Sequence, residues 1–132
     1  MAGQANNYGP IQTFIAGGTI VAGQALMMNG TTEGEVVVTT GITVDVAGVA
    51  LTSAASGEQV DVFTGGAKLR CRTGGIIACH AQVVAGATGD METFTGAGAT
   101  AKSCGIALQA SGGDGQFIEV LFRPGVNHPP NS

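Results

Sequence analysis

The sequence lacks tryptophan, contains one tyrosine, Tyr8, and has charged side chains at only 11% of its 132 residues. A disordered polyelectrolyte or a coiled coil carries far more charge than this. Glycan-binding sites usually present exposed aromatic rings, so the scarcity of such rings argues against a sugar-binding surface. Hydrophobic residues still make up 44% of the chain, which is enough to build a folded core.

Basic residues are also scarce, and none precedes position 68; the five are Lys68, Arg70, Arg72, Lys102 and Arg123. With a net charge of −4, the chain has no dense basic face for nucleic acid. The mildly apolar segment 14–28 lacks the basic flank of a secretory signal, and glycines and polar residues interrupt it too early for a membrane span. We therefore expect synthesis in the cytoplasm, with no nucleic-acid or membrane partner.

Residues that carry chemistry are few and scattered. The cysteines, Cys71, Cys79 and Cys104, are odd in number and lie 8 and 25 positions apart, whereas structural zinc ligands usually come in pairs two to four residues apart. His80 follows Cys79, which permits a Cys/His nucleophile or a zinc site with Cys71 and Cys104 as the alternative to free thiols, and His128 lies in the proline-rich tail, where nothing fixes its geometry. The glycine clusters lack the lysine of a phosphate-binding loop. We expect no catalytic residue, metal, cofactor or small-molecule substrate.

Runs of β-branched and aromatic residues predict strands at 35–40, 42–46, 59–63 and 117–122. Several of them alternate with period two, as a half-buried strand does. Turns are expected at Asn29-Gly30, Gly65-Gly66, Gly89-Asp90 and 112–115. No window has a clean helical period, so the fold class is all-β.

An internal repeat is the most informative feature of the sequence. Residues 17–20 recur as 74–77, and Gly48-Val49-Ala50-Leu51 recurs as Gly105-Ile106-Ala107-Leu108, both at an offset of 57. Residues 60–62 match 118–120 at an offset of 58, which indicates one inserted residue in the second copy. The alternative is chance matching in a chain rich in glycine, alanine and valine.

We interpret residues 11–123 as a single β domain made of two pseudo-repeated units, about 16–71 and 72–123. Half-units of this size do not bury a face alone, so we expect them to share one small β-barrel or β-sandwich core. Residues 1–10 form an extended N-terminal arm, and the proline-rich residues 124–132 form a C-terminal tail.

Lys68, Arg70 and Arg72 alternate with Leu69 and Cys71, so on a strand the three cations project from one face. This stripe is either a docking surface for an acidic partner or the solvated face of an edge strand protected against mispairing.

The segments 18–26, 48–62, 75–84 and 105–122 resemble the capsid decoration, or cement, proteins of tailed bacteriophages. The resemblance implies a non-enzymatic virion protein, made in the host cytoplasm, that binds the major capsid protein on the outer capsid surface. It further implies a homotrimer that sits at local threefold positions of the expanded icosahedral head and stabilises the shell.

Two further interpretations accompany this resemblance. Tyr8 and Phe14 are the large apolar groups of the N-terminal region, so we expect them to anchor it on the capsid or on a neighbouring subunit. The runner-up function is another non-enzymatic virion β module, such as a shell, fibre or glycan-binding adhesin domain. An enzyme or an acyl carrier acylated at Lys68 or Lys102 is the remaining class.

Overall fold

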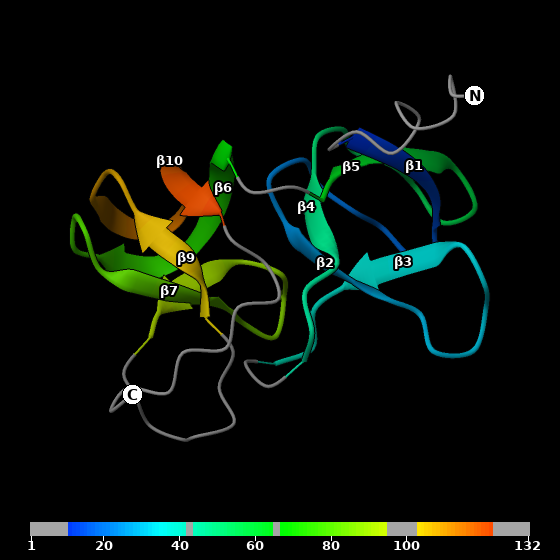
Figure 1. Cartoon of the computed structure of the whole chain (residues 1–132), viewed down its shortest axis with the longest axis horizontal. Helices are drawn as coiled ribbons and strands as arrows, with labels where there is room; N and C mark the ends of the chain where they lie inside the picture. The colour runs from blue at the N-terminus through cyan, green and yellow to red at the C-terminus, as the bar shows by residue number, and fades with distance from the viewer. Residues whose placement is uncertain (1–10, 42–43, 65–66, 95–102, 123–132) are drawn as a thin grey trace, which may run out of the picture.

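The computed structural model describes residues 11–41, 44–64, 67–94 and 103–122, and Figure 1 shows two β-barrels side by side. The described residues form ten strands and no helix, in two closed barrels of five strands each. The predicted all-β fold built on small barrels is therefore confirmed. The expected arm at 1–10 and tail at 124–132 lie outside the described residues.

The first barrel has the closed strand order β1-β3-β2-β4-β5. Its strands are β1 (Ile11–Ala16), β2 (Ala25–Met28), β3 (Glu35–Val38), β4 (Gly48–Ala50) and β5 (Gln59–Phe63). The β1–β3 pair is parallel and the other pairs are antiparallel.

The second barrel repeats this topology, with the closed order β10-β6-β8-β7-β9. Its strands are β6 (Ala67–Ile77), β7 (Gln82–Ala85), β8 (Met91–Thr93), β9 (Ser103–Ala107) and β10 (Ser111–Phe122). Here the parallel pair is β6–β8, which corresponds to β1–β3.

The strand registers of the two barrels agree residue by residue. Leu26 pairs with Gly48 in the first barrel and Val83 with Gly105 in the second, so both partners are displaced by 57. The pairing of residues 15 and 59 recurs between 72 and 117, where the second partner is displaced by 58. The extra residue therefore lies at the register shift between Asp114 and Phe117 in β10. A β-bulge accommodates one inserted residue without disturbing the pairs on either side of it.

Each barrel has its own core, so the expectation of one shared core is wrong. One buried cluster lies wholly in the first barrel and includes Leu26, Val36 and Val60. The other is centred on the second barrel and includes Met91 and Phe122. Five strands close completely in each unit, and a barrel of so few strands has a narrow interior that small side chains such as valine and alanine fill.

The predicted boundary between the repeats, at 71/72, falls inside β6. The structure places the join between β5 and β6 instead, because β6 pairs with β10 along nearly its whole length. Strands β1 and β6 occupy equivalent positions but have unlike sequences, IQTFIA against KLRCRT. Sequence matching therefore begins only at Gly17, after β1, and at Gly74, inside β6, and it misses the true start of each unit.

Two local predictions also differ from the structure. Residues 44–46 of the predicted strand 42–46 lie outside any strand, and residues 42–43 lie outside the described residues. Residues 112–115, predicted as a turn, belong to β10 and lead into its bulge. Gly115 has a φ of 78°, which glycine adopts without strain, so the glycines here serve a bulge rather than a hairpin.

The two barrels are joined by hydrogen bonds between the β7–β8 loop and the ends of β2 and β3. The bonds with a donor in the first barrel are Ala25 N to Gly89 O at 2.7 Å, Gln24 Nε2 to Thr88 O at 2.8 Å and Thr39 Oγ1 to Gly86 O at 2.7 Å. In the reverse direction, Arg72 N donates to Gly23 O at 2.9 Å. Ala25 and Val49, which are fully buried, belong to the second barrel's core cluster. The junction is therefore both hydrogen-bonded and apolar.

The glycine that recurs in the repeated Gly-Val-Ala-Leu and Gly-Ile-Ala-Leu segments is required by close packing. A Cβ at Gly48 would lie 2.5 Å from the carbonyl oxygen of Phe63, and a Cβ at Gly105 would lie 2.0 Å from that of Leu121. Strands β4 and β9 thus approach their neighbours at a point where no side chain fits. Barrel closure depends on this contact in both units.

We predict that Gly105→Ala lowers the free energy of unfolding by about 2–3 kcal/mol, because backbone atoms must move to admit the methyl group. Gly75→Ala is the matched control, since nothing lies within 4 Å of a Cβ there. Urea denaturation of both variants measures the effect. Equal stabilities of the two variants would contradict this explanation of barrel closure.

Candidate functional site

The cationic stripe lies on the outer face of β6, as its alternation with Leu69 and Cys71 predicted. Lys68 and Arg70 are exposed and Arg72 is half-buried. Two of the three cations have acidic partners: Lys68 Nζ lies 3.7 Å from Glu119 Oε1, and Arg72 Nε lies 3.6 Å from Asp90 Oδ1. Within the described part of the chain, Arg70 makes no ion pair. The charge available to a partner is therefore concentrated at Arg70.

Arg70 lines a groove of about 160 Å³ between the two barrels. The remaining lining residues are small or apolar: Ala22, Gly23, Ala50, Leu51 and Phe117. Leu51 and Phe117 are 38% and 43% exposed, so the groove presents apolar surface to solvent beside a cation. Such a combination suits a partner segment with a carboxylate next to an apolar side chain.

The sequence reasoning missed Phe117 and Leu51 as surface residues. Leu51 directly follows β4, and Phe117 begins the predicted strand 117–122. Its neighbour Ile118 is 3% exposed and faces inward, which turns Phe117 outward by the period-two rule. The alternation of side chains along the strand 117–122 was the sequence signal from which the outward orientation of Phe117 could have been predicted.

Of the two predicted N-terminal anchors, Tyr8 and Phe14, only Phe14 is among the described residues. Tyr8 lies outside the described residues. Phe14 lies in β1 opposite Val60 and packs, half-buried, against the core of the first barrel. Much of its surface is thus used within the barrel rather than displayed on an arm.

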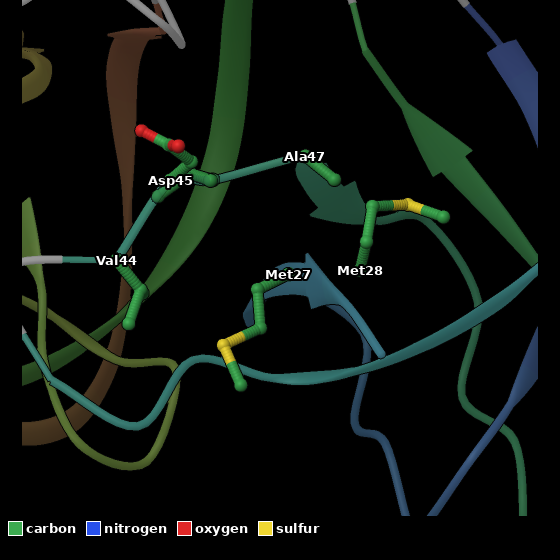
Figure 2. A pocket seen from close by; sticks show the side chains of 6 residues that line it. Met27, Met28, Val44, Asp45 and Ala47 are labelled. Atoms are coloured by element: carbon green, nitrogen blue, oxygen red, sulfur yellow. The ribbon is translucent and has the colours of Figure 1, made fainter. Parts of the chain in front are cut away.

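A second, larger pocket of about 520 Å³ lies beside β2 in the first barrel and is shown in Figure 2. It is lined by Met27, Met28 and residues 44–47, the segment that precedes β4. Met28 is 46% exposed, and Figure 2 shows it on the opposite side of β2 from Met27. Flexible methionine side chains adapt to partners of varied shape, so this pocket is a second candidate contact surface.

The three cysteines are free thiols, and their surroundings differ. Cys71 and Cys104 are buried in the second barrel, where burial raises the pKa of each thiol to about 12. Cys79 is exposed and donates a weak bond to the carbonyl of Leu108 at 3.5 Å. Its neighbour His80 is exposed and has a φ of 73°.

Asp90 is a buried carboxylate at the edge of the barrel junction. Oδ2 accepts a bond of 3.3 Å from Thr88 Oγ1, while Oδ1 has no hydrogen bond and faces Arg72. Loss of water on burial raises the pKa of Asp90, an effect that Arg72 and Thr88 oppose and Asp114 reinforces. Ionisation of Asp90 is therefore less favourable in the folded protein than in water.

Among the residues that the structure describes, no group of three His, Cys, Asp or Glu side chains could hold a metal ion. Over the same residues, no helix is long and apolar enough to cross a membrane. The features that distinguish the molecular surface are the groove beside Arg70 and the methionine pocket.

Comparison with known proteins gives a match in fold. The chain is similar to a solved structure described as "The crystal structure of head fiber gp8.5 N base in bacteriophage phi29", with a TM-score of 0.66 and 18% sequence identity. The similarity covers 89% of this chain and 98% of that one, so it includes both barrels. No family model and no curated protein sequence matches the chain.

We predict that one thiol, Cys79, reacts rapidly with Ellman's reagent in the native protein at pH 8. Cys71 and Cys104 stay unreactive, because thiols with a pKa of about 12 are almost wholly protonated at this pH and their sulfur atoms are buried. All three react after denaturation, and Cys79→Ser removes the native signal. Rapid native reaction of two or more thiols would contradict the burial described.

We predict that Asp90→Asn raises the stability of the protein at pH 7. Because the pKa of Asp90 is raised in the folded state, the protonated carboxyl stabilises the fold relative to the ionised one. This contribution to stability is complete below the ordinary pKa of aspartate and is lost as the pH rises through the pKa of Asp90 in the folded protein. The advantage of the variant therefore shrinks towards pH 3, as urea denaturation at both pH values measures. Glu33→Gln, at an exposed site, is the control. A variant less stable than the wild type at pH 7 would mean that the Arg72 contact outweighs burial.

Proposed function

We propose that this protein is a non-enzymatic structural component of a tailed-bacteriophage virion, bound to the major capsid protein on the outside of the expanded head. The observation that carries the proposal is the fold match, which extends over both barrels to the N base of a bacteriophage head fibre. The resemblance of four segments of the sequence to capsid decoration proteins supports the same location.

In this role the protein stabilises the shell by mass action. A protein that binds the expanded lattice and not its precursor lowers the free energy of the expanded state without any chemical step. Local threefold positions of the head call for a cyclic trimer, and we propose that the protein binds there as a homotrimer.

The groove beside Arg70 is the surface that we assign to the shell. It combines a cation with no ion pair in the described structure and the exposed side chains of Leu51 and Phe117. An interface core needs apolar anchors, and a charged group at its edge steers the approach of an acidic partner. Lys68 and Arg72 contribute less, since Glu119 and Asp90 already neutralise them.

A second candidate function is the base of a head fibre, which the similarity to the gp8.5 N base favours. The two roles predict different defects in virions that lack the protein. Virions without a decoration protein release their DNA at lower temperature, whereas virions without a fibre base lose their fibres and keep the stability of the shell.

We predict that the purified protein co-sediments with expanded heads that lack it and does not co-sediment with unexpanded procapsids. Arg70→Gln weakens binding about tenfold or more, equivalent to about 1.4 kcal/mol. Lys68→Gln, which removes the same charge from a cation that already has a partner, changes binding less than about twofold. Equal binding to procapsids would refute the proposed role, and equal effects of the two variants would place the contact elsewhere.

A further inference from the structure

Each half of the junction between the barrels has an equivalent surface on the other barrel, and much of that surface is exposed. In the junction, the second barrel contributes the β7–β8 loop (86–90), Arg72 and Phe117, which together we term the loop face. The first barrel contributes residues 23–25, Thr39 and residues 49–51, which we term the receiving face. Because the barrels are equivalent in register, each also carries the face that the other uses.

The counterpart loop face lies on the first barrel and consists of the β2–β3 loop (29–34), Ile15 and Gln59. In the junction Gly86, Gly89 and Asp90 are buried, whereas residues 30–34 of the counterpart are all exposed. Counted between paired positions, the connection from β2 to β3 is two residues longer than that from β7 to β8, since Leu26 pairs with Val38 and Val83 with Thr93. Ile15 is 38% exposed, and Ile11 on the same face of β1 is 54% exposed.

The counterpart receiving face lies on the second barrel, at residues 80–82 and 106–108. Ala25 and Val49 are fully buried in the junction, but the equivalent Gln82 and Ile106 are only half-buried. In Figure 1, β7 and β9, which carry this face, lie at one end of the molecule, and the loop from β2 to β3 lies at the other. Such an arrangement suits a head-to-tail contact between copies, which generates a ring or a filament.

Side-chain size at the centre of the two contacts is also matched. In the junction, Gly23 lies against Phe117, and a Cβ at Gly23 would lie 2.8 Å from the Phe117 ring. The equivalents on the open faces are His80 and Gln59. Both Gly23 and His80 have positive φ, at 95° and 73°, so the turn is the same. On the open faces, His80, which is larger than Gly23, takes the place of the glycine, and Gln59, which is smaller than Phe117, takes the place of the phenylalanine.

The acidic residues of the first barrel disfavour contact between two first barrels. Residues 1–67 contain five acidic residues and no Lys or Arg, whereas residues 68–132 contain five basic and four acidic residues. First barrels therefore repel one another, which disfavours a contact between two loop faces.

We propose that the loop face of the first barrel docks on the receiving face of the second barrel of another copy, at positions equivalent to those of the contact made within each one. Three of the junction's hydrogen bonds do not recur there, because Ala81 replaces Gln24, Phe94 replaces Thr39 and Ile15 N already donates to Gly34 O at 2.9 Å. This assignment deepens the proposed function, on which it rests for the closed trimer. It places Gln59 of one copy near Cys79 and His80 of the next, in the relation that Phe117 has to Ala22 and Gly23 in the groove between the barrels.

The test is chemical crosslinking of Gln59→Cys with a short bismaleimide, using native Cys79 as the second thiol. We expect covalent dimers and trimers, with none larger if the ring closes at three. Wild type and the double variant Gln59→Cys/Cys79→Ser give no such products. The assignment would be overturned if crosslinking persisted in the double variant, or if the protein self-associated without giving a crosslink. It would also be overturned if the protein were a monomer that gave no crosslinks either in solution or on heads.

A matched pair of substitutions gives an independent measurement. Leu108→Arg, on the open receiving face, weakens self-association about tenfold or more by analytical ultracentrifugation. Ile76→Arg, at an apolar residue of the second barrel that is 77% exposed and lies on neither face, leaves self-association unchanged, and circular dichroism checks that both variants fold. Equal effects of the two would refute the proposed interface. Crosslinking without binding to heads would support the interface and contradict the capsid role. Trimers that bind heads but give no crosslinks would support the capsid role and contradict the interface.

Discussion

The hydrogen bonds between the β7–β8 loop and the ends of β2 and β3 determine most of what distinguishes this molecule. They fix two similar barrels in an unsymmetrical relation, in which one loop is buried and the equivalent loop is exposed. Thr39 and Gln24 donate side-chain bonds to backbone carbonyls of the loop, so the contact has a defined geometry as well as apolar area. The groove beside Arg70 exists because the barrels meet here and, within the described residues, no third element covers Leu51 and Phe117.

Much of the fold was readable from the sequence, because the repeat is visible where backbone geometry constrains it. Gly48 and Gly105 recur since no Cβ fits between β4 and β5 or between β9 and β10. Strands β1 and β6 were not recognisable as equivalents, because their residues differ on both faces: Phe14 corresponds to Cys71 on the inward face, and Thr13 corresponds to Arg70 on the outward face. The closure of each unit into its own barrel was also beyond the sequence, because it depends on which strands pair over long separations in the chain.

The candidate site was predicted in part. Alternation along β6 placed the three cations on one face, but only the folded structure brings Glu119 to Lys68 and Asp90 to Arg72 and leaves Arg70 at the groove. Phe14 was assigned to the arm from its sequence position, whereas pairing with β5 places it against the first core. The groove is assembled from four separate parts of the chain, 22–23, 50–51, Arg70 and Phe117, and no local pattern links them.

A duplicated barrel with one contact made internally and its counterpart exposed is the arrangement from which we propose head-to-tail assembly. Its most direct test is a cryo-electron microscopy reconstruction of expanded heads saturated with the protein. We expect density on the outer surface at local threefold positions, with the β2–β3 loop of each copy seated against β7 and β9 of the next. Copies that touch through other faces, or an outer surface that carries no density, would contradict it.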